Sequence, residues 1–253
     1  MLHLPKMILF DYGHTLLYEP DFDFLRAEEE IFRHIKRNPH GVTAAESTRF
    51  GLELFERFQQ ARSSGFELHE WQTLKTKYDY LGIELDISIP EAEEILWTAA
   101  SPGECMPHVH ELLSCLKKLG IRSGVISNIG WSGSALRNRI NRLLPENEFE
   151  FVIASSECGI RKPDPFIFEL ALRKAGLACS DVWYCGDSVK ADVYGAHGAG
   201  IHPVLYEESN TSEGLWFDNT GLSIPFPHLH IRSWTEMITL LETLAQETSE
   251  IQF

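Results

Sequence analysis

Near the start of the 253-residue chain, residues 7–16 read MILFDYGHTL. Four apolar residues lead into Asp11, and Gly13 follows two positions later. A short apolar run that stops at turn-forming residues is typical of a buried strand in a parallel sheet. The stretch therefore predicts an α/β protein whose first strand, over residues 7–10, places Asp11 at its carboxyl end.

From residue 101 onward, apolar stretches of strand length alternate with amphipathic stretches of helix length. The predicted strands cover 124–128, 149–154, 182–185 and 202–206, and the predicted helices cover 109–119, 133–143, 165–175 and 189–197. Such alternation with short connections predicts a Rossmann-like, doubly wound parallel sheet. Right-handed crossovers then bring the carboxyl ends of its strands to one edge.

Residues 19–100 have a different character, because helical periodicity dominates there and strand signals are missing. Phe50, Leu54 and Phe58, for example, recur at the spacing of one helix face. We expect an all-helical cap domain of about four helices over 19–100, inserted into a core domain formed by 1–18 and 101–253.

The end of the chain carries weaker signals. Residues 207–230 predict an irregular stretch, in which Trp216 and Phe217 are candidate anchors of a protein interface. A final helix is expected over about 234–246. The sequence leaves the oligomeric state open between a monomer and a homodimer.

Four polar residues stand at or just beyond the carboxyl ends of the predicted strands, where open α/β sheets bind ligands. They are Asp11, Ser127, Lys162 and Asp187. Two carboxylates suit a hard divalent cation such as Mg²⁺. A hydroxyl and an ammonium group suit phosphoryl oxygens, and an ionised carboxylate beside them can act as a nucleophile.

Four segments of the chain, in order, resemble the motifs of the haloacid dehalogenase-like (HAD) hydrolases. They are Ile8–Leu16, Val125–Asn128, Arg161–Pro165 and Gly186–Asp192, the last of which reads GDSVKAD. The helical insert directly after the first motif resembles the C1-type cap of subfamily I. The resemblance covers about residues 7–206 and implies a Mg²⁺-dependent hydrolase, in particular a phosphatase for a small phosphorylated metabolite.

The resemblance also implies a role for each residue that binds substrate. Asp11 would attack phosphorus and become an aspartyl phosphate. Ser127 and the backbone of Asn128 would hold the phosphoryl oxygens. Lys162 would bind substrate as well, and would stabilise the charge of the nucleophile and of the transition state.

The same resemblance implies a metal site. Mg²⁺ would be held by the carboxylates of Asp11 and Asp187 and by the main-chain carbonyl of Gly13. Asp192 would complete this group of residues by orienting either a metal-bound water or Lys162.

The chain departs from the family pattern at Gly13, where phosphatases of this family usually carry a second Asp. A glycine carbonyl can still bind a metal, but it cannot transfer a proton, which typically contributes ~10²- to 10⁴-fold to the rate. Tyr12, His14, Glu19 or a residue of the insert are candidate substitutes. A labile leaving group, as in an acyl or aryl phosphate, needs no acid.

Three other functions remain open at this point. In a haloacid dehalogenase-type enzyme Asp11 attacks carbon, although Asp187 then has no metal to hold. A phosphonatase or phosphotransferase is the second, and a phosphonatase needs a lysine from the insert such as Lys36, Lys75 or Lys77. The third is a regulatory protein that binds Mg²⁺ and phosphate without turnover.

Composition excludes several classes of partner. The 22 basic and 37 acidic residues give a formal net charge of −15, which argues against a nucleic acid or an anionic membrane surface. No stretch reaches the ~18 apolar residues of a membrane span. The five cysteines form no CxxC pair, which is typical of free thiols in the cytoplasm.

Overall fold

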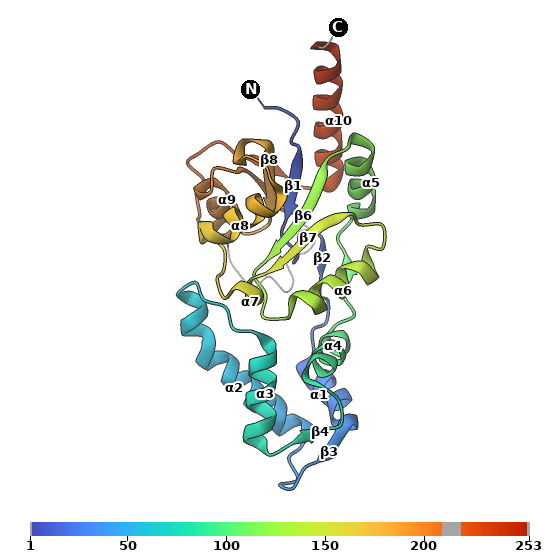
Figure 1. Cartoon of the computed structure of the whole chain (residues 1–253), viewed down its shortest axis with the longest axis vertical. Coiled ribbons are helices and arrows are strands. Elements are labelled where there is room, and N and C mark those ends of the chain that lie inside the picture. The colour runs from blue at the N-terminus through green and yellow to red at the C-terminus, as the bar shows by residue number, and fades with distance from the viewer. Residues whose placement is uncertain (1, 209–218, 252–253) are drawn as a thin grey trace.

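The computed structural model describes residues 2–208 and 219–251, and a six-stranded sheet lies at its centre (Figure 1). The strand order is β10-β9-β8-β1-β6-β7, and every neighbouring pair is parallel. The strands are β1 (Met7–Phe10), β6 (Arg122–Ser127), β7 (Phe149–Ala154), β8 (Val182–Gly186), β9 (His202–Tyr206) and β10 (Leu229–Ile231). The predicted Rossmann-like α/β core is therefore confirmed.

Helices cover both faces of this sheet, because the side chains of each central strand alternate between two apolar layers. Ile8 and Phe10 pack on one face, and Met7 and Leu9 on the other. The first face is covered by α5 (Val109–Leu119), α6 (Gly133–Leu143) and α10 (Trp234–Ile251), the second by α8 (Pro165–Ala175) and α9 (Tyr194–Gly198). Three short helical turns lie in the connections: α7 (Ser155–Cys158), η2 (Cys179–Asp181) and η3 (Val189–Val193). Strand β1 lies between β8 and β6 in the middle of the sheet, and all four of its residues are buried. Asp11 follows directly after it.

The insert begins and ends at one place on the sheet's carboxyl edge. Strand β2 (Leu17–Tyr18) pairs antiparallel with β5 (Glu104–Cys105), and four helices lie between them. They are α1 (Phe24–Ile31), α2 (Ala44–Ser63), α3 (Glu70–Leu81) and α4 (Ile89–Ala100), all below the sheet in Figure 1. Capping boxes start α2 and α4, as their sequences favour. Buried residues of α1, α3 and α4 form an apolar cluster of their own.

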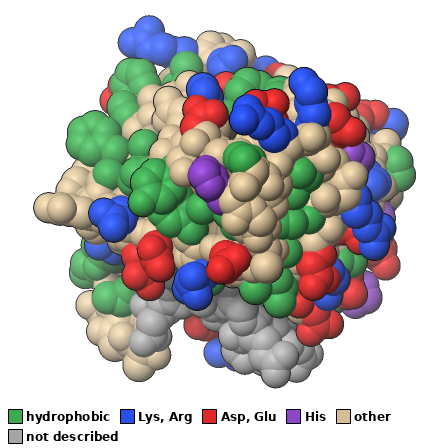
Figure 2. Space-filling view, turned by 90° about the horizontal axis from the view of Figure 1, so that it is seen from below, with side chains coloured by type: hydrophobic (Ala, Val, Ile, Leu, Met, Phe, Trp, Pro, Cys, Tyr) green, Lys and Arg blue, Asp and Glu red, His purple; other side chains and the backbone are tan. Residues whose placement is uncertain are grey.

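The insert is not all-helical, so this part of the prediction is wrong. Two short strands, β3 (Ile35–Arg37) and β4 (Glu84–Leu85), pair antiparallel at its far end, next to the 3-10 turn η1 (Phe32–His34). Elements of two or three residues are too short to show a period of two in the sequence. Figure 2 views this end of the molecule, where acidic and basic side chains are interspersed rather than gathered by sign.

Two further differences concern the segments after the fourth motif. The predicted helix over 189–197 is a π-helical turn, η3, followed by the short α9. The predicted irregular stretch 207–230 ends in β10, which extends the sheet beside β9. Trp216 and Phe217 lie outside the described residues. Among the helices of the described part, none is long and apolar enough to cross a membrane.

Candidate active site

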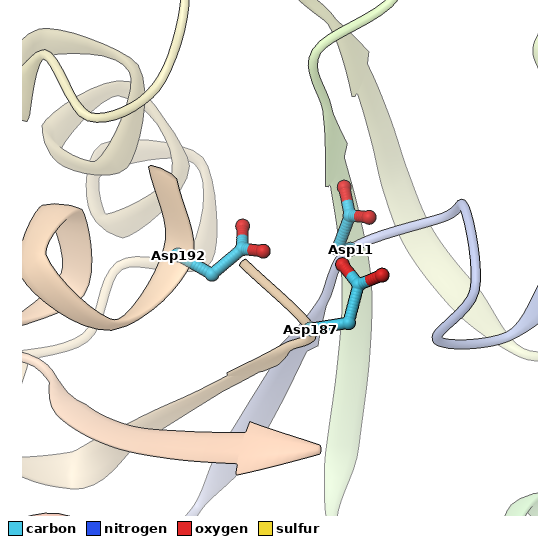
Figure 3. A group of neighbouring side chains, drawn as sticks. All are labelled: Asp11, Asp187 and Asp192. Atoms are coloured by element: carbon cyan, nitrogen blue, oxygen red, sulfur yellow. The ribbon is translucent and has the colours of Figure 1, made fainter. Parts of the chain in front are cut away.

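Three carboxylates meet at the carboxyl edge of the sheet (Figure 3). Asp11 follows β1, Asp187 follows β8, and Asp192 comes from η3. One oxygen of each lies within 4.8 Å of the others, and all three residues are buried. The sheet topology therefore brings together two residues of the predicted edge and a third from the following turn.

The crowding of these carboxylates changes their proton affinity. Burial, reinforced by Asp192 and opposed by Lys162, raises the pKa of Asp11 to about 6. Burial and the charges of Asp11 and Asp192 raise the pKa of Asp187 well above its ordinary value. Both raised pKa values indicate that negative charge is unfavourable at this buried site, so a bound cation would be stabilised there.

The side chain of Lys162 brings a positive charge to the centre of the site. Its Nζ donates to Asp11 Oδ1 at 2.6 Å and to Asp192 Oδ1 at 2.7 Å. It also donates to the Ile126 carbonyl at 3.0 Å and to the Tyr184 hydroxyl at 2.7 Å. Burial opposes the charge, but Asp11 and Asp192 outweigh it and raise the pKa of Lys162. The side chain is thus held charged and in place against the nucleophile candidate.

The backbone around Lys162 is held by Asn128. Asn128 Nδ2 donates to the Lys162 carbonyl at 2.9 Å, and its Oδ1 accepts from the Lys162 N–H at 2.7 Å. Ser127, the last residue of β6, is buried one position earlier. The structure therefore brings Ser127 and Asn128 to the same edge as Lys162, with the Asn128 side chain fixing the lysine's loop.

The carboxylates of Asp192 and Asp187 differ in how many of their oxygens already accept hydrogen bonds. Both oxygens of Asp192 have protein donors, since Oδ1 accepts from Lys162 and Oδ2 from the Ser188 N–H at 2.9 Å. A Cβ at Gly186 would overlap the carboxyl group of Asp192, so the close approach of Asp192 to this backbone requires glycine. Asp187 Oδ2, by contrast, is buried and has no hydrogen-bond partner among residues 2–208 and 219–251.

This orphaned oxygen tests whether the residues fit a divalent cation. Asp187 Oδ2 and the Asp11 oxygen that Lys162 does not hold are hard donors in a crowded acidic site, which is the chemistry that Mg²⁺ prefers. Gly13 follows in the turn after Asp11 and is half-buried. The donor set present in the structure fits a divalent cation.

The gap left by the glycine at position 13 is open. A Cβ at position 13 would have no atom of the described residues within 4 Å, apart from its chain neighbours. Of the candidate substitutes, Tyr12 donates from its hydroxyl to Glu19 Oε1 at 3.0 Å, and Trp97 Nε1 donates to the same oxygen at 2.9 Å. Burial and the charge of Glu19 raise the pKa of the Tyr12 hydroxyl well above its ordinary value. Tyr12 and Glu19 are therefore hydrogen-bonded to each other. The third candidate, His14, has a left-handed backbone with φ of 51°.

Sequence reasoning missed Tyr184. It lies on β8, fully buried, and its hydroxyl accepts from Lys162 and lies 3.1 Å from both Asp192 Oδ1 and the Ile126 carbonyl. A tyrosine inside a buried strand needs a hydrogen-bond partner for its hydroxyl, and its position two residues before Gly186 is the signal available in the sequence.

The insert contacts the core beside these residues. Glu67, in the loop before α3, accepts hydrogen bonds from Arg62 Nε at 3.0 Å, from Ser155 Oγ at 2.9 Å and from Arg161 Nη1. Its side chain is fully buried. Phe66 forms an antiparallel bridge with Ile160, so the loop of the insert lies against the segment that leads into Lys162.

A second contact joins α4 to the loop after β6. Glu93 accepts from the Ser132 N–H at 2.7 Å and from the Ser132 hydroxyl at 2.5 Å. The same carboxylate accepts from Trp71 Nε1 at 2.7 Å, which ties the start of α3 to this contact. Both segments of the core that carry the candidate phosphate-binding residues are thus bonded to the insert.

Comparison with known proteins gives the family. A family model described as "Haloacid dehalogenase-like hydrolase" matches residues 47–206, which include Ser127, Lys162 and Asp187 but begin after Asp11. Glyceraldehyde 3-phosphate phosphatase from Pyrococcus furiosus is 26% identical over 256 residues, covering 96% of this chain and 94% of the relative. The protein of that name from Pyrococcus abyssi is 31% identical over 214 residues, covering 80% and 81%.

Solved structures agree on the fold. A 2-haloacid dehalogenase from Pseudomonas syringae superposes with a TM-score of 0.63 at 21% identity, covering 95% of this chain and 99% of that chain. A HAD phosphatase from Thermococcus onnurineus gives 0.61 at 21% identity, covering 93% and 97%. Since the family model matches more than half of the chain, which has the expected fold, this protein belongs to the haloacid dehalogenase-like hydrolases.

Proposed function

We propose that this hydrolase is a Mg²⁺-dependent phosphatase that acts on a small phosphorylated metabolite, with Asp11 as its nucleophile. The observation that carries the proposal is the arrangement of Asp11 between a buried ammonium group and an orphaned carboxylate oxygen. Lys162 Nζ lies 2.6 Å from Asp11 Oδ1, and Asp187 Oδ2 has no hydrogen-bond partner in the part of the chain that the structure describes. Relatives that align with four fifths or more of the chain are named phosphatases, which supports the same assignment.

In the proposed reaction, a carboxylate oxygen of Asp11 attacks phosphorus. An Oδ–P bond forms as the bond from phosphorus to the leaving oxygen breaks. The leaving oxygen takes a proton from solvent. Water then attacks the same phosphorus and gives up a proton to solvent as the Oδ–P bond breaks, which restores the carboxylate and releases phosphate. Lys162, the Ser127 hydroxyl and the Asn128 backbone hold the phosphoryl oxygens during both steps.

The proposed cation site consists of Asp11, Asp187 and the carbonyl of Gly13. Mg²⁺ bound there supplies positive charge to the phosphoryl oxygens and offsets the repulsion among the acidic residues. Asp192 acts beside this site, because its oxygens hold Lys162 and the Ser188 N–H.

We also propose that residues 19–100 are a cap domain on a core of residues 1–18 and 101–253. The contacts of Glu67 and Glu93 with the core lie in the segments next to Lys162 and Ser127, which supports a cap that covers the phosphoryl site. A cap of this kind excludes water and selects small substrates.

Two alternatives receive less support. A dehalogenase reaction leaves the buried Asp187 carboxylate without a purpose. A phosphonatase needs a lysine that faces the site, but Lys77 donates to Glu28 at 2.6 Å inside the insert and Lys75 pairs with Asp79 on the exposed surface. The glycine at position 13 favours one remaining alternative, a protein that binds Mg²⁺ and phosphate without turnover.

The test is hydrolysis of a panel of aryl, acyl and sugar phosphates with Mg²⁺ and with a chelator. We expect metal-dependent release of phosphate that is lost in Asp11→Asn, and rates that fall steeply as the leaving group becomes more basic, because position 13 offers no acid. An Asp11→Asn variant as fast as wild type would refute the nucleophile. Binding of phosphate with Mg²⁺ but no turnover of any ester would favour the non-catalytic alternative.

A further inference from the structure

The turn that carries Asp187 depends on partners outside itself. Asp187 leads through Ser188 into η3, and the start of a helix leaves N–H groups without partners in the helix. Inside the turn, Ser188 Oγ accepts from the Ala191 N–H at 3.1 Å and Asp192 accepts from the Ser188 N–H. The Val189 N–H and the Asp187 carbonyl find their partner far along the chain.

That partner is Asn219. Its Oδ1 accepts from the Val189 N–H at 3.0 Å, and its Nδ2 donates to the Asp187 carbonyl at 2.8 Å. A carboxamide offers an acceptor and a donor side by side, so one side chain bridges both backbone groups. The bridge spans the residues on either side of Ser188 and closes the turn.

Asn219 begins a segment that packs on the core. We call this segment, residues 219–228, the strap. The Leu222 N–H donates to the Asn219 carbonyl at 3.1 Å in a turn where Gly221 has φ of +76°, a conformation that favours glycine. Tyr194 donates from its hydroxyl to the Ser223 carbonyl at 2.7 Å. The Phe226 ring stacks on His197.

Apolar packing completes the strap. Phe226 and Ile224 pack against Val189, Val193 and Leu205, which belong to η3 and β9. The strap is therefore anchored on the same elements that form the turn of Asp187, and it holds Asn219 over that turn.

Electrostatics explains why such a bridge matters. Asp187 lies next to Asp11 and Asp192, and mutual repulsion favours any movement of the turn that separates the carboxylates. A turn closed on both sides of Ser188 resists this movement. It keeps Asp187 Oδ2 aimed into the site before any cation arrives, which lowers the cost of binding.

We propose that Asn219 is a positioning residue that fixes the Asp187 carboxylate for the divalent cation, and that the strap holds Asn219 in place. The inference rests on the proposed function, because it takes Asp187 as a ligand of the cation. It concerns a residue beyond the part of the chain that the family model matches.

The test measures Mg²⁺ binding to the full chain by calorimetry, together with the Mg²⁺ dependence of turnover. We expect Asn219→Ala to weaken Mg²⁺ binding by about tenfold, as loss of a residue that orients a metal ligand does. Its kcat at saturating Mg²⁺ should stay near that of wild type. Asn219→Ser, which keeps a small polar residue in the turn, should show a loss in the same direction and serves if the alanine variant does not fold.

The matched control is Ser223→Ala. Ser223 lies in the same strap, its side chain is exposed, and only its backbone carbonyl accepts from Tyr194. The Ser223→Ala variant should therefore bind Mg²⁺ as tightly as wild type. Folded Asn219 variants with wild-type Mg²⁺ affinity would overturn the inference, even if their thermal stability fell. A wild type that binds no Mg²⁺ overturns the cation site and the inference together. A wild type that binds Mg²⁺ but hydrolyses no ester removes the proposed reaction alone, and the calorimetry still decides the role of Asn219.

Discussion

Lys162 shows how a single buried charge organises the site. Its three protons face four acceptors, namely Asp11, Asp192, Tyr184 and the Ile126 carbonyl. The Lys162 side chain is 1% exposed, and its buried charge is tolerated because these oxygens replace water around the ammonium group. Since acceptors outnumber protons, a phosphoryl oxygen can take over one hydrogen bond without leaving Lys162 unpaired.

Gly13 gives the most direct prediction for a single residue. Gly13→Asp should raise the rate on phosphates with basic leaving groups by about tenfold or more, because general acid catalysis is typically worth ~10²- to 10⁴-fold. The described part of the chain leaves room for the side chain, since none of its atoms beyond the chain neighbours lies within 4 Å of the added Cβ. The rate constants for a sugar phosphate and an aryl phosphate should converge in the variant.

The control for this substitution is Gly13→Asn, which has the same shape and cannot transfer the proton. It should leave the rate on sugar phosphates where it is in wild type. If the two variants gave equal rates on every ester, the missing acid would not be what limits the enzyme.

The sequence predicts most residues of the site because parallel strands end at one edge. These residues stand at or just beyond the carboxyl ends of predicted strands, so the strand order brings them to one edge: Asp11, Ser127, Lys162 and Asp187. Tyr184 escapes such reasoning, because a tyrosine in an apolar strand has the same pattern as a core residue. Its role depends on a hydroxyl direction that only the packed sheet defines.

Helix α3 begins where the insert meets the core. His69 caps it by accepting from the Trp71 N–H at 3.2 Å, and the Glu70 N–H donates to the Gly130 carbonyl at 2.8 Å. The Glu70 side chain is half-buried there. Burial raises its pKa to about 7, with Glu93 and Glu67 adding to the shift and nearby Lys77 and Arg62 opposing it.

This shift predicts a pH-dependent contribution of Glu70 to stability. Because the pKa is higher in the folded chain than the ordinary 4.5, the stabilising contribution is fully present below about pH 4.5 and is lost as the pH rises through about 7. Glu70→Gln should therefore match wild type near pH 5 and exceed its Tm by a few degrees near pH 8. Thermal unfolding across this range measures the difference.

Glu53→Gln provides the comparison on an exposed part of α2. Its Tm should differ from that of wild type by the same small amount at every pH. A Glu70→Gln curve parallel to that of wild type would show that the carboxyl group is ionised at no cost to the fold.

The elements that the sequence does not predict are the short ones. β3 and β4 depend on each other across the insert, and Ile35 and Leu85 pair over a separation of fifty positions. β10 has three residues and forms because β9 offers a free neighbour for Leu229–Ile231. Local sequence patterns predict the long helices and the buried strands, whereas the pairing of these short strands depends on tertiary contacts.

At the scale of the whole molecule, insert and core are joined through buried carboxylates. Glu67 gathers Arg62 from the insert with Arg161 and Ser155 from the core, and Glu93 holds Ser132. A buried carboxylate with one donor removed is costly, so each contact favours a single arrangement of the two parts. The candidate site adds three further buried carboxylates, those of Asp11, Asp187 and Asp192, which repel one another.

Binding of Mg²⁺ should therefore stabilise the entire fold. At a concentration 100-fold above its Kd, the ligand adds about 2.7 kcal/mol, which corresponds to roughly 5–10 °C in Tm for a chain of this size. Asp187→Asn should lose this rise, and should unfold at a higher temperature than wild type in chelator, because it removes one of the repelling charges. An equal Mg²⁺-induced rise in both proteins would place the cation elsewhere.

The pairing of β2 with β5 makes the insert interchangeable in principle. Leu17 lies opposite Cys105 and Tyr18 opposite Glu104, so the chain departs and returns one strand spacing apart. Any foreign segment whose two ends lie that close can be spliced between these strands without stretching the sheet. If the proposed function holds, a chimera that takes this segment from another hydrolase should change its substrate preference while Asp11, Asp187 and Asp192 stay in place.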